Sequence, residues 1–227
     1  TLTAMKLAKA MECGWNLGNT LDARGSWLPE SKVFPFNQGL DSETCWGEEQ
    51  TTKAIIGTVI KNGYKTIRIP VTWSNHLTDT NYTIDPVWMN RVKQIVNWAY
   101  DAGYYVILNE HHSVHDDMNS PLNKCEGYIV AKESAAESKA FLKAIWTQIC
   151  KNFNEEYDEH LIFETMNEPR DTAHEHCWNT KPDTCDICEA EVALVNEYNQ
   201  LILNTIRESG GNNANRFVMV PAMGTGI

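Results

Sequence analysis

Residues 161–170 read Leu-Ile-Phe-Glu-Thr-Met-Asn-Glu-Pro-Arg, an apolar run that leads into Asn167, Glu168 and Pro169. The apolar run predicts a buried strand. Strand pairing is expected to stop at the proline, because proline has no backbone donor. A carboxyl group at that point lies at the edge of a sheet, where a ligand can reach it. Glu168 is therefore the first candidate for chemistry, and a solvated turn residue is the alternative interpretation.

At three points the sequence changes from a helix pattern to an apolar strand pattern, with a glycine between the two. These glycines are Gly63, Gly103 and Gly210. Glycine suits these points because many helices end in a left-handed residue. The expected strands cover residues 14–17, 65–71, 104–109, 161–166 and 217–221. Strands that alternate with helices predict βα units in chain order around a parallel sheet.

Length, composition and charge limit the classes of protein to consider. The 227 residues fit one large α/β domain, and we expect a single domain over residues 1–227. The net charge of −11 argues against a nucleic acid as partner, since binding to phosphate depends on Lys and Arg. No apolar run approaches the ~20 residues of a membrane helix, so we expect no membrane partner.

The chain contains seven cysteines, an odd number, so at least one is free or paired with another chain. Three cysteines and two histidines crowd one short segment: His174, His176, Cys177, Cys185 and Cys188. These ligand types make a zinc site conceivable, but their spacing matches no standard zinc finger. A disulfide-tied surface loop is the simpler interpretation and predicts a secreted protein. The Asn-Tyr-Thr triplet at residues 81–83 fits the same extracellular setting.

Polar and aromatic groups follow the expected strands at their carboxyl ends, the edge where parallel α/β folds bind ligands. They are Asn16, Arg68 with Trp73, then Asn109, Glu110, His111 and His112, and finally Asn167 and Glu168. Such groups suit a sugar, whose ring faces stack on tryptophan and whose hydroxyls need hydrogen-bonding partners. The candidate platforms are Trp15, Trp46, Trp73 and Trp178, and each could instead be a packing residue.

Arg68 lies within an Ile-Arg-Ile strand, so its charge requires a partner, and a carboxylate at the same edge is the natural one. His111 and His112 could bind a metal. We prefer a role in orienting a catalytic carboxyl group by hydrogen bonding, and we expect no metal and no cofactor.

Four motifs together carry a resemblance. They are Gly14 to Asp22, Thr66 to Trp73, Leu108 to His112, and Met166 to Pro169. In this order they resemble the cellulase branch of glycoside hydrolase family 5. The resemblance implies a (β/α)8 barrel of the TIM type and endo-acting hydrolysis of β-1,4-glucan with retention.

The resemblance also implies roles for individual residues. Glu168 corresponds to the general acid/base, Asn167 to the residue that holds the sugar 2-hydroxyl, Arg68 to the strand-two arginine near the nucleophile, and His111 to the strand-three histidine. Asn16, His112 and Trp178 correspond to substrate-cleft positions, and we add Trp73 as a further substrate-binding candidate.

One part of the family pattern is missing. A retaining glycosidase needs two carboxyl groups about 5 to 5.5 Å apart, and the family places the second on strand seven. The sequence stops at Ile227, just after the fifth expected strand, so we expect a partial barrel without its last three βα units. Asp116, Asp117 and Glu126 lie in a loop that the sequence cannot place.

This departure leaves several functions open. We expect weak activity, and the alternatives are an inactive glucan-binding remnant and an endohydrolase of mannan or mixed-linkage glucan. Two open sheet edges also predict self-association into a homo-oligomer.

Overall fold

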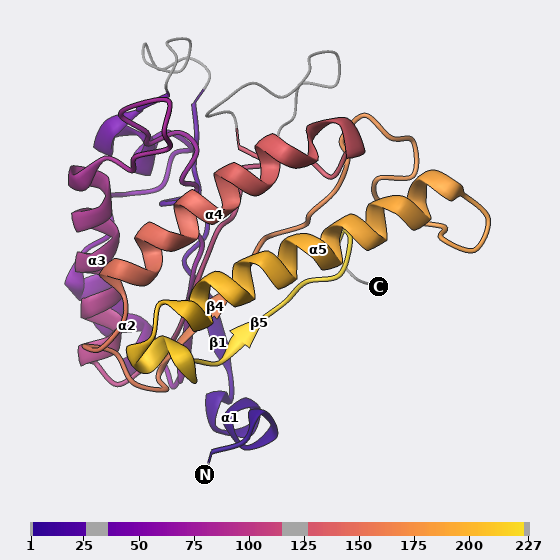
Figure 1. Ribbon diagram of the computed structural model, residues 1–227. Coiled ribbons are helices and arrows are strands. Elements are labelled where there is room, and N and C mark those ends of the chain that lie inside the picture. Colours follow the sequence, from indigo (N-terminus) through magenta and orange to yellow (C-terminus); the bar gives the residue numbers. More distant parts are fainter. Residues whose placement is uncertain (1, 26–35, 115–126, 225–227) are drawn as a thin grey trace.

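The computed structural model describes residues 2–25, 36–114 and 127–224 of the chain. Its five parallel strands form one open sheet in the order β1-β2-β3-β4-β5 (Figure 1). They are β1 (Gly14–Asn16), β2 (Thr66–Ile69), β3 (Tyr105–Asn109), β4 (Leu161–Glu164) and β5 (Val218–Met219). All five predicted strands are confirmed in the predicted order, each somewhat shorter than expected. The architecture is that of a partial (β/α)8 barrel.

The connecting segments are mainly helical. The α-helices are α1 (Ala4–Met11), α2 (Lys53–Lys61), α3 (Pro86–Asp101), α4 (Ala135–Asn152) and α5 (Asp186–Glu208). Short 3-10 helices are η2 (Gly39–Thr44), η3 (Lys132–Ser134) and η4 (Gly211–Ala214). None of the described helices combines the length and the apolar character that crossing a bilayer requires.

One face of the sheet packs against α2 to α5, with α4 and α5 side by side (Figure 1). Alternate strand residues such as Ile67, Leu108 and Phe163 are fully buried there. They meet apolar stripes of the helices, for example Val92 of α3 and Ile202 of α5. Because side chains alternate along a strand, the intervening residues point to the other face.

That other face is the interior side of the barrel and changes from apolar to polar along the strands. Near the amino ends, Leu7 of α1 packs against Ile107 and Ile162. Arg68 of β2 is in register with Ile107 of β3. Two residues further along β3, Asn109 is in register with Glu164 of β4. The polar groups therefore gather toward the carboxyl ends of the strands, as parallel α/β folds lead one to expect.

Candidate active site

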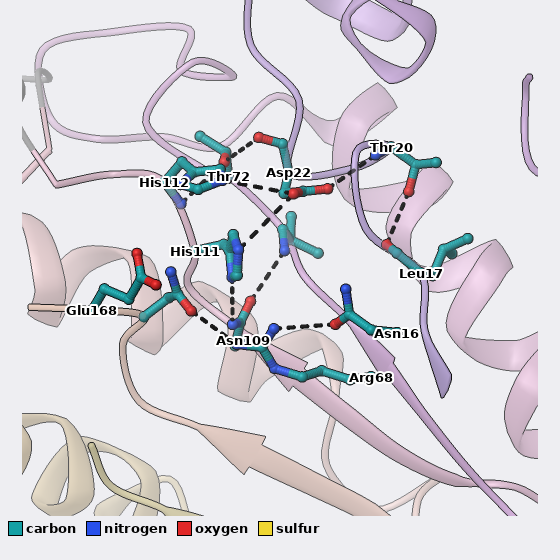
Figure 2. A network of polar contacts seen from close by, with 12 residues as sticks. Asn16, Leu17, Thr20, Asp22, Arg68, Thr72, Asn109, His111, His112 and Glu168 are labelled. Atoms are coloured by element: carbon teal, nitrogen blue, oxygen red, sulfur yellow. Dashed lines mark hydrogen bonds and ion pairs between the residues drawn. The ribbon is translucent and has the colours of Figure 1, made fainter. Parts of the chain in front are cut away.

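Arg68 is the centre of the polar group on the inner face. Its Nε donates to Glu164 Oε2 at 2.8 Å, and its Nη2 donates to Glu164 Oε1 at 2.5 Å. Its Nη1 donates to Asn16 Oδ1 at 3.1 Å, and its Nη2 also donates to Asn167 Oδ1 at 3.0 Å (Figure 2). The expected carboxylate partner of Arg68 is thus Glu164, and one guanidinium joins side chains from β1, β4 and the segment after β4.

Asn109 connects this group to His111. Its Nδ2 lies 3.0 Å from Glu164 Oε1 and 2.9 Å from His111 Nδ1. The backbone N–H of Val71 donates to Asn109 Oδ1 at 3.1 Å, which fixes the amide so that Nδ2 is the donor. His111 Nδ1 therefore accepts, and its proton lies on Nε2, which faces Asp22 Oδ2 at 3.9 Å (Figure 2).

Both histidines of the pair are neutral. Burial, with help from His112 and Arg68, lowers the pKa of His111 to about 2. Burial and the nearby cations Arg24, Arg170 and Arg68 lower the pKa of His112 to about 4. Neutral imidazoles can each offer one donor and one acceptor to a ligand at neutral pH.

Asp22 lies beside this pair, with Oδ2 3.7 Å from His112 Nε2. Burial raises the pKa of Asp22, although the backbone N–H of Thr20 partly opposes this by donating to its Oδ1 at 2.9 Å. Asp22, His111 and His112 place ligand atoms within 4.8 Å of one another. A metal therefore stays the alternative to the hydrogen-bonding role predicted for the two histidines.

Glu168 adopts a backbone conformation that glutamate rarely takes. Its φ of 49° lies in the left-handed region, and Pro169 follows it. Such a conformation is unfavourable by roughly 1 kcal/mol or more and persists where the surrounding structure holds it. Arg170 contributes to that hold, since its Nη1 donates to the Glu168 carbonyl at 2.9 Å. The Glu168 side chain is 38% exposed, so solvent and ligands can reach it.

The tryptophans differ in their exposure. Trp178 is 56% exposed, and the guanidinium carbon of Arg170 lies 4.1 Å from its ring centroid. The prediction that Trp73 binds substrate is wrong, because Trp73 is fully buried in the core and its indole N–H donates to the Asn109 carbonyl at 3.0 Å. Trp46, which is 39% exposed, lies 5.6 Å from the His112 ring, centroid to centroid. It is a better candidate platform than Trp73.

Two polar residues belong to this site that the sequence did not single out for it, Asp22 and Glu164. For Asn109, which the sequence placed at this edge, the structure adds the bridging role. Strand alternation was the available signal for Glu164, since it lies two residues after inward-facing Ile162. Glu110, by contrast, is fully buried, and among the described residues no hydrogen bond joins its side chain to Arg68. Burial raises the pKa of Glu110 to about 8 against the opposing effects of Ser113 and Arg24.

The cysteines of the segment before α5 also differ from expectation. Cys177, Cys185 and Cys188 all have free thiols, so the predicted disulfide-tied loop is wrong for them. Cys125 lies outside the described residues, as do Asp116, Asp117 and Glu126.

Comparison with known proteins bears on this arrangement. The sequence model of the cellulase family, glycosyl hydrolase family 5, matches residues 22–225. The chain belongs to this family. Endoglucanase B of Ruminococcus albus is a similar family protein, 41% identical over 223 residues, and the match covers 97% of this chain and 47% of the endoglucanase.

Solved structures of the family are similar as well. A glycoside hydrolase 5 lichenase from Caldicellulosiruptor sp. F32, in complex with cellotetraose, has a TM-score of 0.86 and 38% identity over 99% of this chain and 55% of its own. A broad specificity endoglucanase from Ruminococcus champanellensis with bound cellotriose has a TM-score of 0.83 and 42% identity over 98% of this chain and 58% of its own. The chain thus spans about half the length of these family members.

Proposed function

We propose that this chain carries the acid/base half of an endo-acting β-1,4-glucan hydrolase site, with Glu168 as the general acid/base. The observation that supports the proposal most strongly is the Arg68 group, which joins Asn16, Glu164 and Asn167 at the carboxyl ends of three strands. In barrels of this type that edge carries the chemistry.

The hydrogen bonds support a role for each side chain in this proposal. Asn167 and Asn16 both use Oδ1 to accept from Arg68, which leaves Nδ2 as the donor that each amide can offer to a sugar hydroxyl. In this proposal Asn167 holds the 2-hydroxyl next to the bond that breaks, and Arg68 is a positioning residue. His111, neutral and protonated on Nε2, offers a donor on the side of Asp22.

The chemistry proposed for Glu168 is proton transfer to the glycosidic oxygen as the bond to the anomeric carbon breaks. In a retaining mechanism a second carboxylate about 5 to 5.5 Å away attacks that carbon, and Glu168 then takes a proton from water. Both oxygens of Glu164 are engaged by Arg68, and one also accepts from Asn109, so Glu164 is not available as this nucleophile. We therefore expect the chain alone to hydrolyse glucan weakly.

Because no nucleophilic carboxylate is identified among the described residues, two further candidate functions remain to be tested. A glucan-binding remnant would keep the cleft without turnover. A related specificity is supported by the names of two relatives, a lichenase and a broad specificity endoglucanase, which indicate that polymer preference varies among similar proteins. We propose His112 and Trp178 as substrate-binding residues in either case, because Trp178 is exposed and His112 lies beside Trp46.

Location and assembly are also part of the proposal. A polysaccharide substrate is too large to cross a membrane, so we expect a secreted protein. Met219 and Val220 at β5 are 46% and 55% exposed, and this apolar edge supports self-association. Size-exclusion chromatography with light scattering tests this expectation, and a monomer over a wide concentration range would contradict it.

The function is tested by two measurements on the same protein. Calorimetric titration with cellohexaose measures binding, and a reducing-sugar assay on cellulose derivatives, lichenan, xyloglucan and mannan measures turnover. Binding with turnover supports the hydrolase, and binding without turnover supports the remnant. Absence of both would overturn the proposed function.

A further inference from the structure

The segment between β4 and α5, together with the first turn of α5, brings together four metal-binding side chains that have no role in the proposed glucan site. His174 and His176 come from the segment, Cys185 caps α5, and Cys188 lies in the first turn of that helix. One ligand atom from each of the four lies within 4.8 Å of the other three. Cys177, although adjacent in sequence, is not a member of this group.

The distances fit a tetrahedral metal. With Zn–S of about 2.3 Å and Zn–N of about 2.05 Å, a tetrahedral angle places sulfur and nitrogen ligands about 3.6 Å apart. Cys185 Sγ lies 3.8 Å from His174 Nε2, and Cys188 Sγ lies 3.5 Å from His176 Nδ1. These separations are close to the value that a shared zinc ion imposes.

A buried carboxylate orients one of the ligands. Glu191 of α5, which is 4% exposed, has Oε2 2.9 Å from His174 Nδ1. Because a carboxylate only accepts, Nδ1 carries the proton and Nε2 keeps its lone pair, directed toward Cys185. A carboxylate behind a histidine is a recurrent feature of zinc sites, where it fixes the ring and its tautomer. The position of Cys185 is fixed too, since its Sγ accepts from the backbone N–H of Cys188 at 3.2 Å.

We propose that His174, His176, Cys185 and Cys188 bind one Zn²⁺ ion that fastens the β4–α5 segment to the first turn of α5. Two thiolates and two imidazoles form the donor set that Zn²⁺ prefers. Four protein ligands complete its coordination and leave no open position for a substrate or a water. The site is therefore structural.

The zinc ion has a consequence for the neighbouring glucan site. Trp178 is only two residues from His176, and Arg170 lies against its ring at 4.1 Å. Arg170 in turn donates to the carbonyl of Glu168 at 2.9 Å. A metal that fixes the segment at His174 and His176 thereby limits the positions that Trp178 can take over Arg170.

The test measures metal bound to the full chain. Protein purified without chelators is analysed for zinc by mass spectrometry and then titrated with Co²⁺, whose tetrahedral thiolate complexes show charge-transfer and strong visible absorption. We expect about one zinc ion per chain in the parent protein. In Cys185→Ser and Cys188→Ser the zinc content should be at least tenfold lower. Cys177→Ser is the matched control, and it should keep the zinc and the cobalt spectrum.

A second variant keeps the test decisive if the cysteine variants do not fold, as judged by circular dichroism. Glu191→Gln retains all four ligands and the size of the side chain but removes the carboxylate charge. We expect it to lower metal affinity about 10- to 100-fold against a competing chelator. Three results would overturn the proposal. The first is a parent protein with free thiols that binds neither zinc nor cobalt, and the second is an unchanged metal affinity in folded Cys185→Ser and Glu191→Gln. The third is a disulfide that joins Cys185 to Cys188 in non-reducing peptide mapping.

Discussion

The guanidinium of Arg68 binds the carboxylate of Glu164 through two hydrogen bonds, of 2.8 Å from Nε and 2.5 Å from Nη2. The pair is largely withdrawn from water, with 25% of the Arg68 side chain and 12% of the Glu164 side chain exposed. Two parallel hydrogen bonds fix the plane of the guanidinium. Its remaining N–H groups therefore reach Asn16 and Asn167 in a defined geometry.

Replacement of Arg68 should cost both stability and ligand binding. In Arg68→Ala the largely buried Glu164 loses the partner of two hydrogen bonds, so we expect the free energy of unfolding to fall by about 2 to 3 kcal/mol in urea titrations. Lys139→Ala is the control, because Lys139 forms an equally short but exposed pair with Glu197, 2.6 Å apart. That variant should lose less than about 1 kcal/mol. Equal losses of unfolding free energy in the two variants would contradict the assignment of Arg68 and Glu164 as a buried, stabilising pair.

Gly18 lies where a larger residue would displace the Asn16 side chain. A Cβ at position 18 would be 2.7 Å from Asn16 Nδ2, the group we expect to donate to the sugar. Gly18→Ala should therefore weaken cellohexaose binding about five- to tenfold, the effect of one lost hydrogen bond. Gly57→Ala is the control, since a Cβ there meets no atom within 4 Å. Unchanged affinity in Gly18→Ala would argue against Asn16 as a ligand-binding residue.

Trp178 is predicted to stack on a sugar ring. Trp178→Ala removes that surface and the contact with Arg170, so the dissociation constant for cellohexaose should rise about tenfold. Val87→Ala serves for comparison, because Val87 is also exposed, at 55%, but lies at the start of α3. If both variants bind the oligosaccharide as the parent does, Trp178 is only a surface residue.

Glu110 should make stability fall as pH rises. Burial raises its pKa from the ordinary value of 4.5, which applies in the unfolded chain, to about 8 in the folded protein, so folding favours its protonated form. The stabilisation is complete below the unfolded pKa and is lost as pH rises toward 8, because the unfolded chain alone gives up the proton. Glu110→Gln removes this dependence. Relative to the parent, the variant should become more stable between pH 5 and pH 8 by a few kcal/mol. A difference that does not vary with pH would show that Glu110 is not protonated in the fold.

The order of the strands could be predicted from the sequence because most of them are apolar runs, three of them follow a glycine, and the strands of a (β/α)8 barrel follow chain order. Arg68, Asn167 and Asn16 could be placed at one edge for the same reason, and the structure joins them. The direction of a side chain just beyond a strand was not predictable. Trp73 follows β2, but it turns into the core and donates to the Asn109 carbonyl.

Contacts across long loops could not be predicted either. Eight residues lie between His176 and Cys185, which is at the start of α5, and no local pattern tells whether such a segment folds back. The sequence therefore favoured a disulfide, whereas the structure shows free thiols next to two histidines. For Glu164, by contrast, the sequence carries a usable signal, because the side-chain alternation of β4 places it on the inner face with Arg68.

The most direct test of the whole account is the hydrolysis rate of the Glu168→Gln variant on a soluble β-glucan. Glu159→Gln, an exposed substitution just before β4 at the opposite end of the strand, is the matched control. Loss of the general acid/base should lower the rate at least about 100-fold while cellohexaose still binds, and the control should match the parent. A Glu168→Gln variant that hydrolyses the glucan as fast as the parent would contradict the central claim.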